Sequence, residues 1–360
     1  MTLIIAEVGV NHNGSEAMAL ELIKQAKGAD ADIVKFQTFK AKSSISSHAK
    51  QAEYQVENTG KTESQLEMVE RLELSFESHK RLLKECDRLN IEFLSTAFDC
   101  ESLDFLVHDL KLTRLKIPSG EITNAPLVLS HARTGCDLIV STGMASLSDI
   151  EMVLGIIAFG YLAPPDIEPS IEQFKSAYFS DKGQKTLREK VTLLHCTTEY
   201  PAPFEDINLK AIDTMSAGFG LPIGYSDHSE GIAVPLAAVA RGAVLIEKHF
   251  TLDRSMEGPD HKASIEPSEL KKMVQGIREI EVCLGSGLKG PRPSEIKNMA
   301  VARKSIVAKE NISKGDMFSY QNLAIKRPGT GISPLYYWDL LGKTSKSDIS
   351  PDELVKLEDY

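Results

Sequence analysis

The sequence predicts an α/β fold, a TIM (β/α)8 barrel followed by a small C-terminal β-rich domain. Eight short, apolar, β-branched runs recur along the chain, and a helical pattern lies between successive runs. Such runs are typical of parallel strands covered on both faces, and eight strand–helix units close a barrel. The predicted strands are 3–9, 31–39, 91–98, 114–120, 137–144, 191–197, 221–226 and 243–250.

Helical periodicity separates the predicted strands, and capping signals support several of the helices. Asp99 and Ser146 are suitable N-cap residues, and Pro267 stands in the first turn of the last barrel helix. The predicted helices are 16–27, 77–89, 101–109, 127–133, 147–157, 206–217, 232–241 and 267–284.

An open doubly wound sheet is the alternative fold, but it requires a glycine-rich phosphate turn after the first strand. This chain has GVNHNG there. The GxGxxG at 285–290 follows a helix and precedes two prolines, so we interpret it as a linker. We therefore expect a catalytic barrel (1–284), a linker (285–294) and a small domain (295–360).

Two insertions, 40–75 and 161–190, interrupt the strand–helix rhythm. Both are longer than a plain connection. Segments of this length on a compact domain often form lids or oligomer contacts.

Composition excludes several classes of function. The net charge of −10 argues against a nucleic-acid partner, so any anionic substrate must meet local positive charge. The five cysteines are widely spaced without a CxxC, which argues against a disulfide frame or structural zinc. Neither a signal peptide nor a membrane span is indicated, and we expect a cytoplasmic protein.

Two histidines, His228 and His249, each end a predicted strand of neighbouring barrel units. Parallel neighbours have their carboxyl ends side by side, so we expect the two imidazoles to meet at the barrel mouth. Two imidazoles leave most of a metal's coordination shell open, which suits a weakly held divalent cation acting on a substrate carbonyl. His195 ranks lower, and we assign no ligand role to His12 or His261.

Charged residues at strand ends form a second set of candidates. Three glutamates lie at or near strand ends: Glu7, Glu121 and Glu247. Each either forms a structural ion pair across the barrel or serves hydroxyl recognition and acid–base chemistry. Lys35 and Lys116 lie within apolar strands and point inward by alternation. A buried lysine needs an acid or an anionic ligand, and a Schiff base is the competing chemistry.

Small hydroxyl-bearing turns follow two of the strands. Ser119 precedes Gly120, and Ser141 opens Ser-Thr-Gly. Such turns donate N–H and O–H groups to anions, so together with two inward lysines they indicate a phosphate site. Arg327, on a turn of the small domain, could reach a partner's active site.

The motifs as a set resemble the sialic acid synthase family, most closely the bacterial N-acetylneuraminate synthases, and the likeness covers nearly the whole chain. The stretches that carry it include AEVGVNHNG, VKFQTFKA, LSTAFD, KIPSGE, LLHCTTEYPAPFEDINL, GYSDHS, IEKHFTLDRSMEGPDH and KRPGTGISP. The resemblance implies a TIM barrel with a C-terminal antifreeze-like (SAF) domain. It also implies a divalent metal, Mn2+ or Mg2+, and a domain-swapped homodimer.

The resemblance assigns roles to individual residues. His228 and His249 match the metal ligands, and Arg327 matches the arginine that a partner subunit directs towards the acetamido group. One departure is Thr198, where some members have Asn, so a phosphate contact there stays open. The remaining matches are Glu7, Glu121 and Glu247 as carboxylates; Lys35, Gln37, Lys116, Ser119, Ser141 and Ser226 around phosphoenolpyruvate; and Tyr200 and Asp260 around the sugar.

The reaction that the resemblance implies is condensation of phosphoenolpyruvate with N-acetylmannosamine and water, giving N-acetylneuraminate and phosphate by C–O cleavage. We expect Glu7 to direct the water, with Glu121 second. The alternative within the family is an N,N'-diacetyllegionaminate synthase that takes a 2,4-diacetamido-6-deoxy sugar. A 6-phosphorylated acceptor is conceivable. A Schiff-base pyruvate aldolase and a non-catalytic sugar-binding protein are further alternatives.

Overall fold

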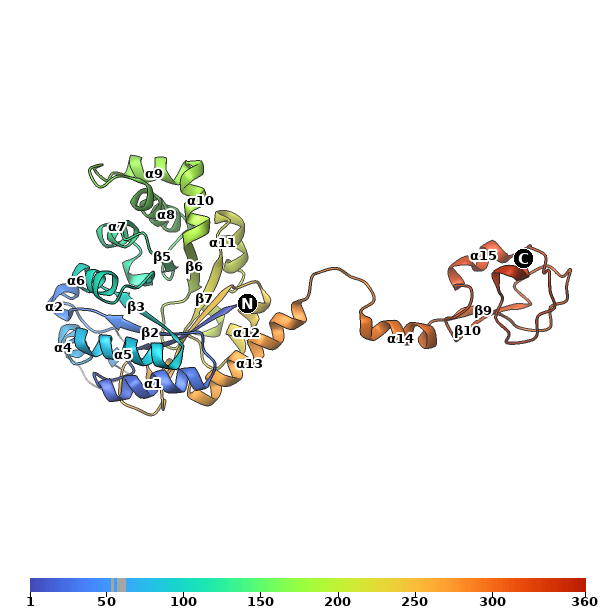
Figure 1. Ribbon diagram of the computed structural model, residues 1–360, viewed down its shortest axis with the longest axis horizontal. Helices are drawn as coiled ribbons and strands as arrows, with labels where there is room; N and C mark the ends of the chain where they lie inside the picture. Colours follow the sequence, from blue (N-terminus) through green and yellow to red (C-terminus); the bar gives the residue numbers. More distant parts are fainter. Residues whose placement is uncertain (53–54, 57–62) are drawn as a thin grey trace. The chain divides into compact units, whose positions relative to one another are not determined.

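The computed structural model describes residues 1–52, 55–56 and 63–360. It divides into two compact units, Met1–Gly285 and Ser286–Tyr360 (Figure 1). Within the described residues, every helix is too short or too polar to cross a membrane.

The first unit is a closed barrel of eight parallel strands in sequential order, as predicted. β1 pairs with both β2 and β8, which closes the ring. The strands lie within a layer of helices (Figure 1). Their bounds are β1 Leu3–Gly9, β2 Ile33–Thr38, β3 Glu92–Ala97, β4 Arg114–Ile117, β5 Asp137–Ser141, β6 Val191–Cys196, β7 Ile223–Asp227 and β8 Leu245–His249.

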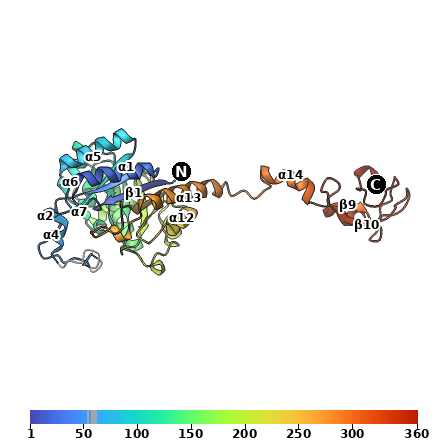
Figure 2. The same ribbon diagram turned by 90° about the horizontal axis from the view of Figure 1, so that it is seen from below.

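The helices of this unit begin largely where the sequence predicts. The Asp99 carboxylate accepts a hydrogen bond from the Ser102 N–H, and Ser146 forms a capping box with Asp149. Figure 2 shows α1, α5 and α13 along one side of the barrel. The bounds are α1 Glu16–Gly28, α2 Ala41–Ser44, α4 Gln65–Glu70, α5 Phe76–Leu89, α6 Cys100–Asp104, α7 Ala125–Arg133, α8 Leu147–Leu162, α9 Ile171–Phe179, α10 Asp181–Lys190, α11 Ala211–Phe219, α12 Ala233–Ala240 and α13 Pro267–Leu284.

Two regions differ from the simple strand–helix pattern. The helix predicted at 101–109 is α6 followed by a π-helical turn, Phe105–Asp109. The 161–190 insertion forms α9 and α10, and α9 packs on α8 with the Phe159 and Phe174 ring centroids 5.4 Å apart. This insertion therefore extends the outer helical layer.

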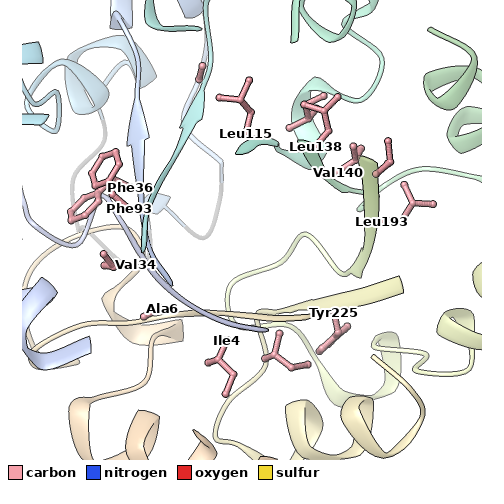
Figure 3. Packing of buried hydrophobic residues seen from close by; sticks show 14 of the residues in the cluster. Ile4, Ala6, Val34, Phe36, Phe93, Leu115, Leu138, Val140, Leu193 and Tyr225 are labelled. Atoms are coloured by element: carbon pink, nitrogen blue, oxygen red, sulfur yellow. The ribbon is translucent and has the colours of Figure 1, made fainter. Parts of the chain in front are cut away.

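Alternation along the strands divides the barrel into an outer and an inner core. Outward residues such as Val34, Leu115 and Val140 pack against the helices (Figure 3). The inner core at the base of the barrel is apolar. Its buried members are Ile5, Ile33, Leu94, Ile139, Leu194 and Leu245.

The next inward position on each of these six strands lies two residues further along, about 6.6 Å nearer the carboxyl end. These positions carry polar or ionisable side chains in place of aliphatic ones. They are Glu7, Lys35, Thr96, Ser141, Cys196 and Glu247. The strand pattern thus places a polar layer directly above the apolar base, at the end where TIM barrels keep their chemistry.

The second unit is small and largely irregular, with one antiparallel pair of strands. β9 Ser305–Ala308 pairs with β10 Leu323–Lys326. A helix that the β-rich pattern did not indicate, α14 Pro293–Ala302, precedes the pair, and a short helix, α15 Tyr337–Leu340, follows it. The unit has its own core, which includes Ile306, Phe318, Leu340 and Val355.

Candidate active site

A cavity of about 410 Å³ opens at the carboxyl ends of the barrel strands. Of the fourteen site residues predicted from the sequence, Arg327 belongs to the second unit, where it is exposed and its Nε donates to the Ala302 carbonyl. The structure brings the others together around this cavity: Glu7, Lys35, Gln37, Lys116, Ser119, Glu121, Ser141, Tyr200, Ser226, His228, Glu247, His249 and Asp260.

Four buried ionisable groups form the floor of the cavity. Lys35 Nζ forms ion pairs with Glu7 Oε2 at 2.9 Å and with Glu247 Oε2 at 3.4 Å. Neither carboxylate oxygen accepts a well-aligned hydrogen bond. Lys116 Nζ lies 3.1 Å from Glu247 Oε1, which also accepts a 2.8 Å hydrogen bond from Ser226. Both lysines therefore have glutamate partners, and both also line the cavity.

The two glutamates have opposite pKa shifts. Burial raises the pKa of Glu7 to about 7, and it outweighs the attraction of Lys35. Burial acts in the same sense on Glu247, but the ammonium groups of Lys116 and Lys35 hold its pKa well below its usual range. Two carboxylates with separated pKa values suit a division between proton transfer at Glu7 and fixed charge at Glu247.

The two predicted histidines meet beside this floor. Their ring centroids are 5.3 Å apart, and the Tyr200 ring lies 4.2 Å from that of His228. The backbone carbonyl of Thr197 lies 2.6 Å from His228 Nδ1. If Nδ1 carries the proton, Nε2 keeps its lone pair, which is the arrangement of a metal-binding imidazole.

Burial also keeps these imidazoles neutral, as ligation requires. It lowers the pKa of His228 to about 4. Burial, and the repulsion that the two rings would have if both were protonated, hold the pKa of His249 well below its ordinary value. Asp260 lies beside His249, with Oδ2 3.8 Å from Nδ1, and burial raises its pKa to about 6.

The residues fit a divalent cation held by two protein ligands. His249 Nδ1 is buried without a hydrogen-bond partner in the structure. Among the residues that the structure describes, no group of three or more His, Cys, Asp or Glu could hold a metal. His228 and His249 would therefore supply part of the coordination shell and leave the rest to water and substrate.

Hydroxyl side chains at or just after the ends of β4, β5 and β6 line the same cavity as the two lysines. Ser119 Oγ accepts from the Gly143 N–H at 3.0 Å and lies 3.0 Å from Cys196 Sγ. Ser141 Oγ and Thr198 Oγ1 are buried without a hydrogen-bond partner in the structure, and both residues line the cavity. Unpaired buried hydroxyls in a cavity that two ammonium groups also line suit an oxyanion ligand.

Glu121 lies apart from the buried floor. It ends a short 3-10 turn, Ser119–Glu121, and its Oε2 accepts a 2.7 Å hydrogen bond from Asn124 at the rim of the cavity. Its place on the cavity wall favours substrate contact more than the buried ion-pair role.

Sequence reasoning missed several residues of the site. Thr96 accepts a 3.3 Å hydrogen bond from Lys35, and inward alternation on β3 could have found it. Asp227 and Lys248 form a buried ion pair behind the histidines, and their charge within buried strands was the available signal. Val10, Phe39, Met68, Val69, Leu72 and Phe98 add an apolar side to the cavity.

Comparisons with known proteins agree with this geometry. Residues 22–289 match the NeuB family and residues 303–360 match the SAF domain. The chain is 49% identical to an N,N'-diacetyllegionaminic acid synthase of Campylobacter jejuni over 99% of both chains. It is 44% identical to the enzyme of that name from Legionella pneumophila, over 96% of this chain and 91% of the relative.

A solved structure of an N-acetylneuraminic acid synthetase also resembles this chain. The N-acetylneuraminic acid (sialic acid) synthetase of Leptospira borgpetersenii, crystallised with citrate, superposes with a TM-score of 0.65 at 34% identity. The match covers 83% of this chain and 90% of that one.

Fold and site together define a TIM-barrel enzyme with a buried, mixed-charge mouth beside two neutral imidazoles. The chain belongs to the NeuB family, and it carries a SAF domain at its C-terminus. It is an enzyme of the transferase class, a nonulosonic acid synthase, as the sequence predicted.

Proposed function

We propose that this enzyme is an N,N'-diacetyllegionaminate synthase, which condenses phosphoenolpyruvate with a 2,4-diacetamido-6-deoxy sugar and water and releases phosphate. The observation that carries the proposal is the 49% identity to a synthase of that name across 99% of both chains. A second relative with the same name supports it at 44% identity. The alternative drawn from the sequence is therefore better supported than the N-acetylneuraminate synthase that the sequence favoured.

Lys35 and Lys116 would bind the anionic groups of phosphoenolpyruvate. Both lysines are buried and line the cavity together with Ser119 and Ser141. Because charge-assisted hydrogen bonds are strong where water is excluded, this arrangement would orient the enol-ether carbon towards the sugar aldehyde. Gln37, Ser226 and the rim residues would complete the contacts.

Carbon–carbon bond formation leaves positive charge at C2 of the former phosphoenolpyruvate. Glu247, held ionised by two lysines, lies in the cavity to stabilise that charge. Water then adds to C2. Glu7, with a pKa of about 7, would accept the proton of that water, and Glu121 is the second candidate. Loss of phosphate by C–O cleavage gives the ketone.

His228 and His249 would hold the divalent cation, Mn2+ or Mg2+, which when bound supplies Lewis-acid polarisation of the sugar carbonyl. Tyr200 and Asp260 lie beside these rings and would contact the sugar.

We also propose that catalysis belongs to residues 1–284, that 285–294 act as a linker, and that 295–360 form a domain exchanged in a homodimer. In that assembly Arg327 of each subunit would reach the partner's acetamido group. The exposed position of Arg327 in its own unit is consistent with such a role. The cytoplasmic location stays a prediction.

A substrate panel tests the proposal. Phosphate release is measured with phosphoenolpyruvate, Mn2+ and each of three acceptors: N-acetylmannosamine, its 6-phosphate and the diacetamido 6-deoxy sugar. We expect the highest kcat/KM with the diacetamido sugar. A higher kcat/KM with N-acetylmannosamine would contradict the proposal and indicate an N-acetylneuraminate synthase. Borohydride trapping with pyruvate should label nothing, since covalent labelling would indicate a Schiff-base aldolase.

Isotope labelling tests the bond that breaks. In 18O-labelled water, label should appear at the C2 oxygen of the product. Bridging 18O placed in phosphoenolpyruvate should leave with phosphate. Retention of that bridging oxygen in the sugar acid would refute C–O cleavage.

A further inference from the structure

The inward faces of β2 and β3 carry a third layer above the polar one. On β2 the inward residues run Ile33, Lys35, Gln37 and then Phe39 just past the strand. On β3 they run Leu94, Thr96 and then Phe98. The Phe98 N–H donates to the Thr38 carbonyl at 3.2 Å, so strand geometry continues to this point. Phe39 and Phe98 therefore make the outer end of the cavity partly apolar on this side, and the polar side chains of Ser44, Gln55 and Gln65 line the same cavity.

The segment after β2 adds to this apolar layer. Met68 and Val69 of α4, and Leu72 just beyond it, line the same cavity. The Phe39 and Phe98 rings pack edge to face, 6.2 Å apart. We call the set the apolar rim: Val10, Phe39, Met68, Val69, Leu72 and Phe98.

Hydrogen bonds and an ion pair tie the start of the segment after β2 to its end. The Lys40 N–H donates to Asp99 Oδ2 at 2.8 Å, and Lys40 Nζ lies 2.9 Å from Glu73. Glu73 also accepts from the Ala41 N–H at 3.2 Å. A capping box of Ser64 and Glu67 begins α4. These contacts lie next to Phe39 at one end of the segment and next to α4 at the other.

The opposite side of the cavity is polar. In the closed strand order, β3 lies four strands from β7, which carries Ser226 and leads to His228. A sugar whose reactive carbonyl lies at the histidines would direct its far end, from C4 to C6, towards β2 and β3. That end would then lie near Phe39 and Phe98, which line the cavity.

We propose that the apolar rim is the subsite that selects the acceptor, by binding the C6 methyl group and the methyl of the C4 acetamido group. The inference rests on the proposed function and names how the sugar would be chosen. An apolar surface contacts methyl groups favourably but leaves hydroxyls without partners and disfavours a 6-phosphate. N-acetylmannosamine carries hydroxyls at both positions, so the rim would select against it.

The test compares kcat/KM for the diacetamido 6-deoxy sugar and for N-acetylmannosamine in rim variants. Val69→Thr keeps the shape of the side chain and replaces a methyl with a hydroxyl. We expect kcat/KM for the diacetamido sugar to fall about tenfold, the effect of one methyl-sized change in an apolar pocket, with a much smaller change for N-acetylmannosamine. Phe98→Tyr is a second variant of the same design.

Leu66→Asn is the matched control. Leu66 belongs to the same helix and the same apolar cluster, but it does not line the cavity. It should alter stability and leave the ratio of the two kcat/KM values unchanged. An equal fall for both sugars in Val69→Thr and Phe98→Tyr would overturn the inference.

Calorimetric binding of each sugar to the wild-type enzyme and to Val69→Thr separates the two proposals. If the enzyme releases no phosphate with either sugar, the proposed function fails. The rim inference then stands if Val69→Thr weakens only the binding of the diacetamido sugar, and it fails if both sugars bind the variant and the wild type alike.

Discussion

Asp227 and Lys248 form an ion pair of 2.6 Å in which neither side chain is accessible to solvent. Asp227 ends β7, and Lys248 stands next to the end of β8. The carboxylate also accepts from the N–H and hydroxyl of Ser229, and the ammonium donates to the Ser229 carbonyl. Because neighbouring strand residues face opposite sides, this outward pair fixes the strand ends whose inward histidines line the cavity.

Removing one member of this pair should destabilise the protein strongly. Lys248→Met leaves the Asp227 carboxylate buried without its counter-charge, which in such sites costs about 3–5 kcal/mol. We expect a loss of that size in the free energy of unfolding, measured by urea denaturation and far-UV circular dichroism.

Two further variants control this prediction. Lys326→Met removes one member of an exposed ion pair with Asp352 and should change stability little. Combining Lys248→Met with Asp227→Asn removes both buried charges and should recover part of the loss. Equal stabilities of Lys248→Met and Lys326→Met would contradict a structural role for the buried pair.

Lys116 should dominate the binding of the anionic substrate. Lys116→Met removes an ammonium group that is 3% exposed and leaves Glu247 with one partner fewer. Truncating one member of a buried charge pair costs about 2–5 kcal/mol, so kcat/KM for phosphoenolpyruvate should fall by at least about thirtyfold. Steady-state phosphate release measures the change.

Lys84→Met is the matched lysine variant, because Lys84 is exposed on α5 outside the barrel. Its kinetics should equal those of the wild type. Lys116→Arg keeps the charge with a different donor geometry and should retain part of the activity. An unchanged KM for phosphoenolpyruvate in Lys116→Met would remove the lysine from the substrate site.

Periodicity alone could predict the barrel and much of the polar layer. The alternation Ile33–Lys35–Gln37 places Lys35 and Gln37 on one inward face whatever the rest of the chain does. His228 follows β7 and His249 ends β8, so the parallel pairing of these two strands brings the histidines together. These predictions depend only on local spacing and on the handedness of strand–helix–strand connections.

Contacts across the molecule could not be predicted in the same way. Val69 of α4 lines the cavity, and the Lys40–Glu73 ion pair ties the residues after β2 to those after α4. No period in the sequence encodes that contact. Likewise, strand ends can be recognised from the sequence, but the pairing of Asp227 with Lys248 depends on the register of β7 on β8. Register is a tertiary property.

Chelation should abolish turnover, and added Mn2+ should restore it. His228→Ala and His249→Ala should lose Mn2+ binding as well as activity, because each removes one of two protein ligands. Mn2+ binding is measured directly by electron paramagnetic resonance, and far-UV circular dichroism checks the fold.

His195→Ala is the matched histidine variant. His195 is also near a strand end, but it stands outside the main cavity and its Nε2 lies 2.7 Å from the Ile207 carbonyl. Mn2+ binding should survive in this variant. Full activity of the wild-type enzyme after exhaustive chelation would exclude a metal role for the two cavity histidines.

His131 should make stability depend on pH. It is 1% exposed on α7, with Nδ1 2.8 Å from the Leu127 carbonyl and Nε2 without a partner in the structure. Burial lowers its pKa from 6.5 to about 4. Between these values the unfolded chain binds a proton that the folded protein does not, so stability rises with pH across this window and is lost as the pH falls.

His131→Leu removes this contribution. The slope of the unfolding free energy against pH should become smaller by up to about 1.4 kcal/mol per pH unit inside the window. Urea denaturation at several pH values measures both slopes. Other buried histidines, among them His12 and His261, keep part of the dependence in the variant, because burial lowers their pKa values too. Identical slopes for the wild type and His131→Leu would contradict the prediction. They would mean that His131 has the same pKa in the folded protein as in the unfolded chain.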